Sequence, residues 1–148
     1  MKVIGVIPVR MNSSRFPDKP MAKIHDMPMV GHCYHRTALA LGKQQTYVAT
    51  CDLEIYDYIR SIGGNAIMTK STHTRATTRT AEALKLIEKQ TSEKLDVVLM
   101  VQGDEPLVNP EIIYSMLDSF REKKVDIVNI MSRIVSKRSF EDENNVKV

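Results

Sequence analysis

Short apolar runs rich in β-branched residues alternate along the chain with longer segments whose apolar residues recur at helical spacing. VIGVIP (3–8) and DVVLMV (96–101) are continuous apolar runs, which is typical of strands buried on both faces of a sheet. The pattern predicts strands at 3–8, 46–50, 65–69, 96–101 and 125–131, and helices at 28–42, 53–62, 80–90 and 110–120.

Several predicted helices carry boundary signals. Pro28 suits a first helical position and Gly42 a helix end, because proline fixes a helical φ and glycine tolerates a left-handed one. Asp52 is placed to cap the next helix, which ends at a glycine pair. Residues 109–111 read Asn-Pro-Glu, which is a cap, a first-turn proline and a first-turn acid in order.

The alternation of strand and helix predicts an α/β fold with a mostly parallel central sheet flanked by helices, in a single nucleotide-binding domain over residues 1–148. In such sheets ligands bind at the carboxyl ends of the strands. We therefore expect the polar loops that follow Pro8, Thr69 and Val101 to lie along one edge of the sheet.

Composition narrows the classes of function. The chain has 148 residues, is 43% apolar and carries a net charge of +3, which is too small for a general nucleic-acid binder. No apolar run approaches the length that crosses a membrane. Cys33 and Cys51 form no framework of paired spacings, so we expect a reduced, cytoplasmic protein. The final NNVKV looks like the opening of a further strand.

The loop RMNSSRFPDKP (10–20) is the first candidate for chemistry. Guanidinium groups bind phosphate oxygens bidentately, an ammonium adds a compact charge, and serine hydroxyls and turn N–H groups donate to the same oxygens. The loop's prolines lower the entropy cost of presenting these groups. The alternative is a solvated basic loop. Neither glycine-rich phosphate-binding pattern occurs in the chain, so a nucleotide would have to bind by another route.

Asp104 and Glu105, in VQGDEP, directly follow the predicted strand at 96–101. An acid at this edge, facing a basic loop, suits Mg²⁺, which takes one or two carboxylates together with substrate phosphates and water. The alternative is an ordinary acidic turn. Together the two loops indicate metal-assisted chemistry on a nucleoside triphosphate.

The polar segment THTRATTR (72–79) is a third candidate. It holds His73 beside Arg75 and Arg79, so His73 is a candidate ligand contact. His32 and His35 are three residues apart with no acidic or cysteine partner nearby, and we interpret them as a surface pair rather than a metal site.

Three motifs, in this order, resemble the sugar-acid cytidylyltransferases, most closely those that act on 3-deoxy-manno-octulosonate. IPVRMNSSRFPDKPMAKIHDMPMV matches the family's I-P-A-R-x-x-S-x-R-x-P-G-K-P-L segment and the x-I-x-G-x-P-M-I that follows it. HTRATTRTAEA matches H-x-S-G-T-[DE]-R-x-A-E-A, and VQGDEP is intact. The resemblance covers the whole chain but only the N-terminal three-fifths of the family's pattern.

The resemblance implies a Rossmann-like nucleotidyltransferase fold and a reaction in which CMP passes from CTP to the anomeric hydroxyl of a sugar acid, with Mg²⁺ as cofactor and pyrophosphate as the leaving group. The catalytic groups it implies are Lys19, Arg10 and Asp104, with Asp104 as the metal ligand. The remaining implied contacts are Asn12, Ser13, Ser14, Arg15, Ala76, Thr77 and Gln102 for the nucleotide, and His73, Arg75, Arg79 and Gln102 for the sugar acid.

Two departures bear on this assignment. Asp18 replaces the family's glycine, and Arg75, Ala76 and Thr78 replace Ser, Gly and an acid. The altered loop suggests a shifted acceptor, such as a nonulosonic acid or a small phosphonate. The family forms homodimers, and the part of its pattern beyond this chain carries a second metal-binding Asp and most of the dimer interface. A non-catalytic nucleotide-binding chain is therefore a third hypothesis.

Overall fold

A computed structural model describes residues 1–12, 16–122 and 125–145. The chain divides into two compact units, residues 1–114 and 115–148, which are described separately. The larger unit contains the sheet and the predicted site residues. No helix of the described residues is long and apolar enough to span a membrane.

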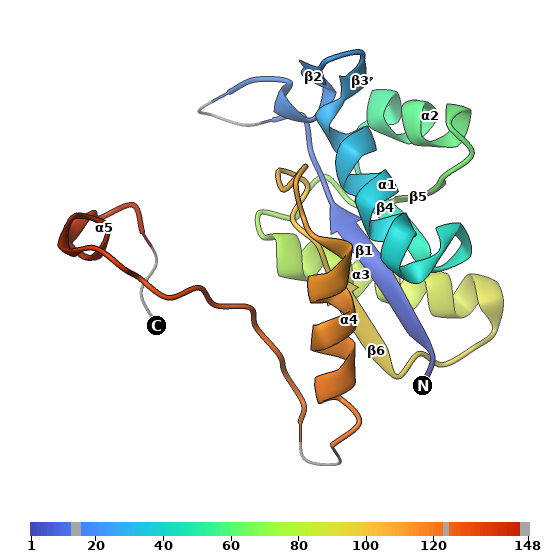
Figure 1. Cartoon of the computed structure of the whole chain (residues 1–148). Coiled ribbons are helices and arrows are strands. Elements are labelled where there is room, and N and C mark those ends of the chain that lie inside the picture. The colour runs from blue at the N-terminus through green and yellow to red at the C-terminus, as the bar shows by residue number, and fades with distance from the viewer. Residues whose placement is uncertain (13–15, 123–124, 146–148) are drawn as a thin grey trace. The chain divides into compact units, whose positions relative to one another are not determined.

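A four-stranded parallel sheet forms the centre of the larger unit (Figure 1). Its strands are β1 (Val3–Pro8), β4 (Thr46–Thr50), β5 (Asn65–Met68) and β6 (Val97–Met100), in the order β5-β4-β1-β6. The parallel sheet confirms the predicted α/β class. Because all four strands run the same way, the loops after β1, β5 and β6 meet at one edge, as expected from the sequence.

The other elements follow the predicted alternation with shifted boundaries. All four predicted helices are present: α1, α2 and α4 agree with the predicted bounds within one residue at each end, and α3 starts four residues earlier than its apolar stripe indicated. The remaining elements are η1 (Lys19–Met21), β2 (Lys23–Ile24), β3 (Met27–Pro28), α1 (Met29–Leu41), η2 (Lys43–Gln45), α2 (Leu53–Ser61), α3 (Ala76–Thr91), α4 (Pro110–Ser119) and α5 (Lys137–Glu141).

Helices cover both faces of the sheet. On one face α3 packs Ala83 and Ile87 against Ile4, Val6 and other buried side chains of the strands. On the other face α1 lies close to β1, because a Cβ placed on Gly5 would lie 2.7 Å from Cδ1 of Leu41. Ile4, Val6 and Ile7 of β1 are buried, which explains why this strand reads as a continuous apolar run, whereas β6 is an edge strand whose Val98 is 36% exposed.

Several boundary predictions need correction. Pro28 lies just before α1 rather than in its first turn, because it pairs in β3 with Lys23. Asp52 precedes α2 but its side chain makes no capping hydrogen bond. Gly42, with a φ of 85°, ends α1 as predicted, and the side chain of Asn109 accepts from the N–H of Glu111 at the start of α4.

The predicted strand at 125–131 is wrong. These residues adopt no regular structure, and Ile127 and Met131 are 80% and 68% exposed. A strand needs a neighbour for its backbone N–H and C=O groups, and no described residue pairs with this segment. The apolar, β-branched composition of this segment is therefore not enough to form a strand. Of the predicted final strand, residues 146–148 lie outside the described residues.

Candidate active site

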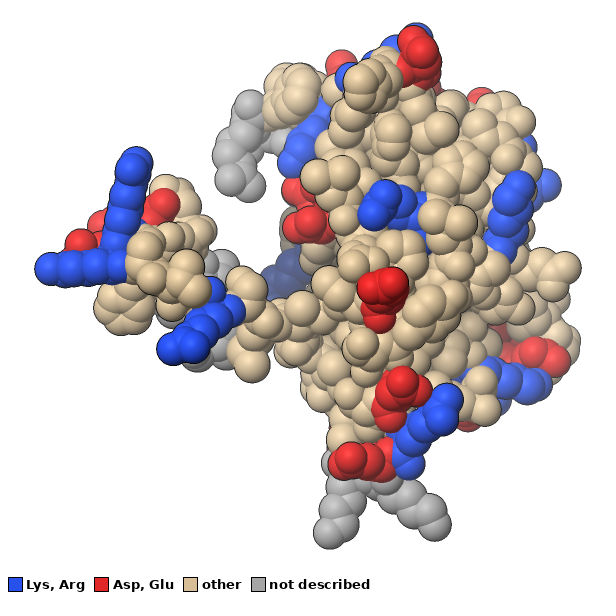
Figure 2. All heavy atoms as spheres, viewed as in Figure 1, with Lys and Arg blue, Asp and Glu red and all other residues tan. Residues whose placement is uncertain are grey.

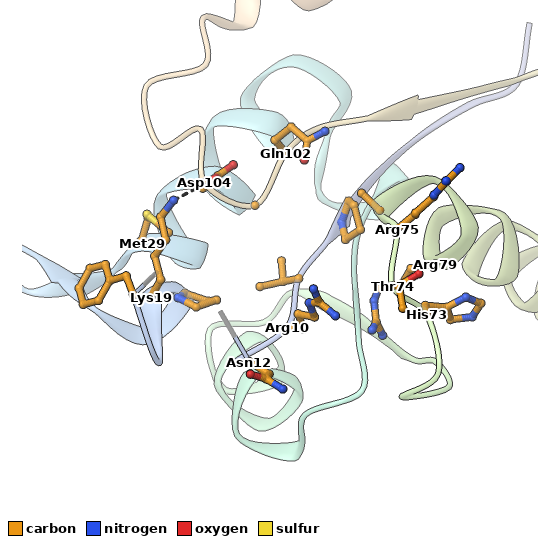
Figure 3. Close-up of a pocket in the computed structure, with 16 residues that line it drawn as sticks. Arg10, Asn12, Lys19, Met29, His73, Thr74, Arg75, Arg79, Gln102 and Asp104 are labelled. Atoms are coloured by element: carbon orange, nitrogen blue, oxygen red, sulfur yellow. Dashed lines mark hydrogen bonds and ion pairs between the residues drawn. The ribbon is translucent and has the colours of Figure 1, made fainter. Parts of the chain in front are cut away.

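A cleft of about 640 Å³ opens at the carboxyl edge of the sheet. Figure 3 shows the Lys19–Asp104 pair on one side of it and residues 73–75 on the other, with Arg10 between them. The lining comes from the three loops that the sequence placed at this edge: Pro8, Val9, Arg10, Asn12, Phe16, Lys19 and Pro20 with Met29; His73, Thr74, Arg75, Ala76 and Arg79; and Gln102, Gly103 and Asp104.

Lys19 and Asp104 form an ion pair on one side of the cleft, with 2.8 Å between Nζ and Oδ2. Lys19 opens η1, and the turn before it is made by Asp18, which adopts a left-handed conformation with a φ of 55°. The carbonyl of Asp18 accepts from the N–H of Met21 at 2.9 Å. The Lys19 and Asp104 side chains are 35% and 53% exposed, so both remain accessible to a ligand.

The start of the basic loop is fixed by the neighbouring strand. The N–H of Val9 donates to the carbonyl of Ala49, and the N–H of Met11 donates to Oδ2 of Asp52, both at 2.9 Å. Asp52 therefore holds the backbone beside Arg10 instead of capping α2. Sequence reasoning missed this role because Met11 and Asp52 are 41 residues apart. Ser13, Ser14 and Arg15 lie outside the described residues.

The turn that carries Asp104 is tied to α1. The thiol of Cys33 donates to the carbonyl of Gly103 at 3.4 Å, and burial raises the pKa of this thiol to about 11. Cys33 is therefore a neutral donor that helps to hold the turn. A side chain at Gly103 would meet Cγ2 of Val9 at 2.7 Å, so glycine lets this turn approach the end of β1 closely.

Arg79 lines the cleft but is only 3% exposed. Its guanidinium donates to the hydroxyl of Thr69, to the carbonyl of Lys70 at 3.4 Å and to Sγ of Cys51 at 3.5 Å. These bonds attach the end of β5 and the following loop to α3. All three of these hydrogen bonds of Arg79 are within the chain. Substrate binding by Arg79 stays a prediction.

His73 also lines the cleft, and both of its ring nitrogens have partners in the chain. Nε2 lies 2.5 Å from Oε2 of Glu82, and Nδ1 lies 3.1 Å from Oγ1 of Thr78. Glu82 additionally accepts from the N–H of Lys70 at 2.9 Å, and this bond, followed by the one to His73, lowers the pKa of the Glu82 carboxyl. Glu82 is the acid in HTRATTRTAEA. The sequence motif therefore contained this residue, but did not indicate that it bonds to His73.

The remaining predicted contacts lie at the cleft with one exception. Gln102 and Ala76 line it, whereas Thr77 is not among the lining residues. Ala76 opens α3, whose first-turn N–H groups carry a partial positive charge that favours anions. Among the described residues the guanidinium of Arg75 has no hydrogen bond or ion pair, so α3 begins at the cleft with a cation beside it.

Among the described residues that line the cleft, basic groups exceed acidic ones. Figure 2 shows basic and acidic side chains interspersed on the face it displays.

Among the described residues no three His, Cys, Asp or Glu side chains gather as a metal cluster. The ring of His32 lies 3.0 Å from the carbonyl of Ile24. One exposed carboxylate, Asp104, suits a Mg²⁺ ion that takes its other ligands from phosphates and water.

A parallel α/β sheet with a basic loop, an acid and a helix N-terminus at its carboxyl edge is typical of proteins that bind anionic ligands at the ends of their strands. The chain belongs to the cytidylyltransferase family, whose model matches residues 4–148. The fold prediction from the sequence motifs is confirmed.

Similar proteins agree with this membership. The chain is 37% identical to the 8-amino-3,8-dideoxy-manno-octulosonate cytidylyltransferase of Shewanella sp. (strain W3-18-1) and 36% identical to the 3-deoxy-manno-octulosonate cytidylyltransferase of Syntrophobacter fumaroxidans. Each match covers 100% of this chain, and 60% and 58% of the respective relative. The chain therefore spans about three-fifths of the length of these curated relatives.

Solved structures show the same fold. A CMP:2-keto-3-deoxy-manno-octonic acid synthetase complexed with CTP superposes with a TM-score of 0.71 at 34% identity, over 82% of this chain and 48% of that one. A nucleotidyl transferase from Methanothermobacter thermautotroptrophicus, at 14% identity, has a TM-score of 0.59 over 79% of this chain and 57% of its own, and shares the fold alone.

Proposed function

We propose that this chain forms the CTP-binding part of an enzyme that transfers CMP to a 3-deoxy sugar acid. The acceptor's anomeric hydroxyl would attack the α-phosphorus of CTP, forming a new P–O bond, while the bond to the β-phosphate breaks and pyrophosphate leaves. The hydroxyl proton passes to solvent or to a base. The observation that supports this most directly is the convergence of Arg10, Lys19, Asp104 and the start of α3 at one cleft.

Phosphoryl transfer of this kind depends on positioning and charge neutralisation more than on covalent catalysis. Arg10 and Lys19 would bind the triphosphate, with Asn12 beside them and Ser13, Ser14 and Arg15 in the same loop. Lys19 would stabilise the charge that develops at the α-phosphate. Gln102, together with Ala76 and Thr77, would contact the nucleoside or the sugar.

The Lys19–Asp104 ion pair fits a site that binds nucleotide and metal together. Triphosphate oxygens would replace Asp104 as the partner of Lys19, which frees the carboxylate to hold Mg²⁺. The bound ion would neutralise phosphate charge. Both side chains are exposed enough for this exchange, and an exposed ion pair of this kind contributes only about 0–1 kcal/mol, so opening it costs little.

A shifted acceptor is the second candidate. Arg75 stands where the family motif has serine, it lines the cleft, and it has no partner among the described residues. A guanidinium there would pair with a carboxylate or phosphonate of the acceptor. The two relatives named above are themselves named for different sugar acids, so acceptor choice varies among similar proteins.

Calorimetric titration with CTP, UTP, GTP and ATP in the presence of Mg²⁺ tests nucleotide binding, and pyrophosphate release with a panel of sugar acids tests the reaction. We expect selective CTP binding, and release only when CTP, Mg²⁺ and a sugar acid are all present. CTP binding without release from any acceptor would favour the non-catalytic hypothesis for this chain. A chain that is folded by circular dichroism but binds no nucleotide would contradict the proposal.

A further inference from the structure

A four-residue network, here called the His73–Glu82 clamp, joins the loop after β5 to α3. It consists of Lys70, His73, Thr78 and Glu82. Oε2 of Glu82 accepts from the N–H of Lys70 at 2.9 Å and lies 2.5 Å from Nε2 of His73. The His73 and Glu82 side chains are 19% and 22% exposed, whereas Lys70 and Thr78 are exposed, so the network lies at the surface of the fold.

Each ring nitrogen of His73 has a hydrogen-bond partner within the chain. The hydroxyl of Thr78 donates to the carbonyl of Arg75 at 2.9 Å, and its oxygen lies 3.1 Å from Nδ1 of His73. Nε2 of His73 lies beside the Glu82 carboxylate. Both ring nitrogens therefore have partners within the chain.

We propose that His73 and Glu82 are positioning residues that place Arg75 at the cleft. His73 and Thr78 lie on either side of Arg75 along the chain, and the clamp holds both, so it fixes the backbone from which the Arg75 guanidinium projects. Arg79 reinforces the clamp by bonding Thr69 and Lys70 at the other end of the loop. The link from Arg75 to acceptor binding rests on the proposed function, whereas the ordering of the loop does not.

Glu88 provides a matched control on the same helix. Its carboxylate accepts from the backbone N–H of Leu95 at 3.1 Å and pairs with Lys94 at 3.0 Å, so it makes the same two kinds of contact as Glu82. In both glutamates the backbone hydrogen bond is the main cause of a lowered carboxyl pKa. Glu88 and Leu95 are absent from the cleft lining.

The first measurement is amide hydrogen exchange of the 148-residue chain without ligand. Glu82→Ala should raise exchange of the Lys70 amide on the order of tenfold, because this N–H loses a charged hydrogen-bond acceptor. Glu88→Ala should instead raise exchange only near Leu95. Glu82→Gln, which keeps an amide oxygen for Lys70 and His73, should restore most of the protection.

Unchanged exchange of the Lys70 amide in Glu82→Ala, or an equal rise there in Glu88→Ala, would overturn the positioning role. The second measurement is binding of 3-deoxy-manno-octulosonate in the presence of CTP and Mg²⁺. Glu82→Ala should weaken it, and should have no further effect in an Arg75→Ala background. Equal losses in both backgrounds would show that the clamp does not act through Arg75. If no variant binds the acceptor, the proposed function fails while the exchange result still decides whether the clamp orders the loop.

Discussion

The two sides of the cleft are built in different ways. On one side Lys19 and Asp104 meet in a single ion pair whose side chains are 35% and 53% exposed. On the other side Arg79 is 3% exposed, and it and the His73–Glu82 clamp tie the loop after β5 to α3 through several hydrogen bonds. The exposed side can exchange its partners for a ligand at little cost, whereas the buried side presents a loop whose position is already set.

The largest expected effect concerns activity at the exposed side. In an active cytidylyltransferase containing these residues, Lys19→Met and Asp104→Asn should each lower kcat/KM on the order of a hundredfold or more, because each removes a charge from the transition state. Their unfolding free energies should change by less than about 1 kcal/mol, as for other exposed pairs. Steady-state kinetics and urea unfolding measure the two quantities. Near-normal activity in both variants would show that the motif residues do not have these roles.

The buried side should give the opposite result. Arg79→Met should lower the unfolding free energy by about 2 kcal/mol, because the hydroxyl of Thr69 and the carbonyl of Lys70 lose a charged donor in a buried setting. Lys19→Met is the matched control, since it also replaces a cation that lines the cleft with methionine. Equal urea midpoints for the two variants would contradict the distinction between the sides.

A smaller effect would sharpen the picture of the exposed side. If Lys19 competes with a metal for Asp104, Lys19→Met should strengthen Mn²⁺ binding in the absence of nucleotide by up to about fivefold, which corresponds to the contribution of an exposed ion pair. Arg10→Met removes a cation from the same cleft that has no recorded bond to Asp104, and it should have a weaker effect. Mn²⁺ binding followed by electron paramagnetic resonance tests this. An equal gain in Mn²⁺ affinity in both variants would mean that the net charge of the cleft, and not the ion pair, determines metal binding.

Local pattern accounts for much of the fold but only part of the site. The predicted bounds of β1 and β4 match the structure, because each strand's signal lies within a few residues of sequence. The cleft edge followed from the parallel topology. By contrast, the Lys19–Asp104 pair spans 85 residues and the Met11–Asp52 bond spans 41, and no local pattern specifies such contacts.

The wrong strand and the missed partners of His73 have the same physical origin. Residues 125–131 have strand-like composition, but a strand forms only where a neighbour pairs with it. His73, which lies in a polar loop beside Arg75 and Arg79, stays a predicted ligand contact and lines the cleft. Its partners, Thr78 and Glu82, lie on the following helix, and only the fold brings them to both ring nitrogens.

The smallest expected effect concerns the turn at Asp18, which places Lys19 on the exposed side of the cleft. Asp18 sets the turn before Lys19 with a φ of 55°, a conformation that glycine adopts freely and alanine does not. Asp18→Ala should therefore lower the unfolding free energy by about 1 kcal/mol, whereas Asp18→Gly should leave it within about 0.5 kcal/mol of the parent, since relief of strain offsets the greater freedom of the unfolded chain.

Both substitutions remove the same negative charge beside the proposed phosphate site, so comparing their CTP affinities separates the effect of backbone conformation from the effect of charge. A tighter CTP complex in both variants would assign the effect of Asp18 to its charge, and a tighter complex in Asp18→Gly alone would assign it to the turn that places Lys19.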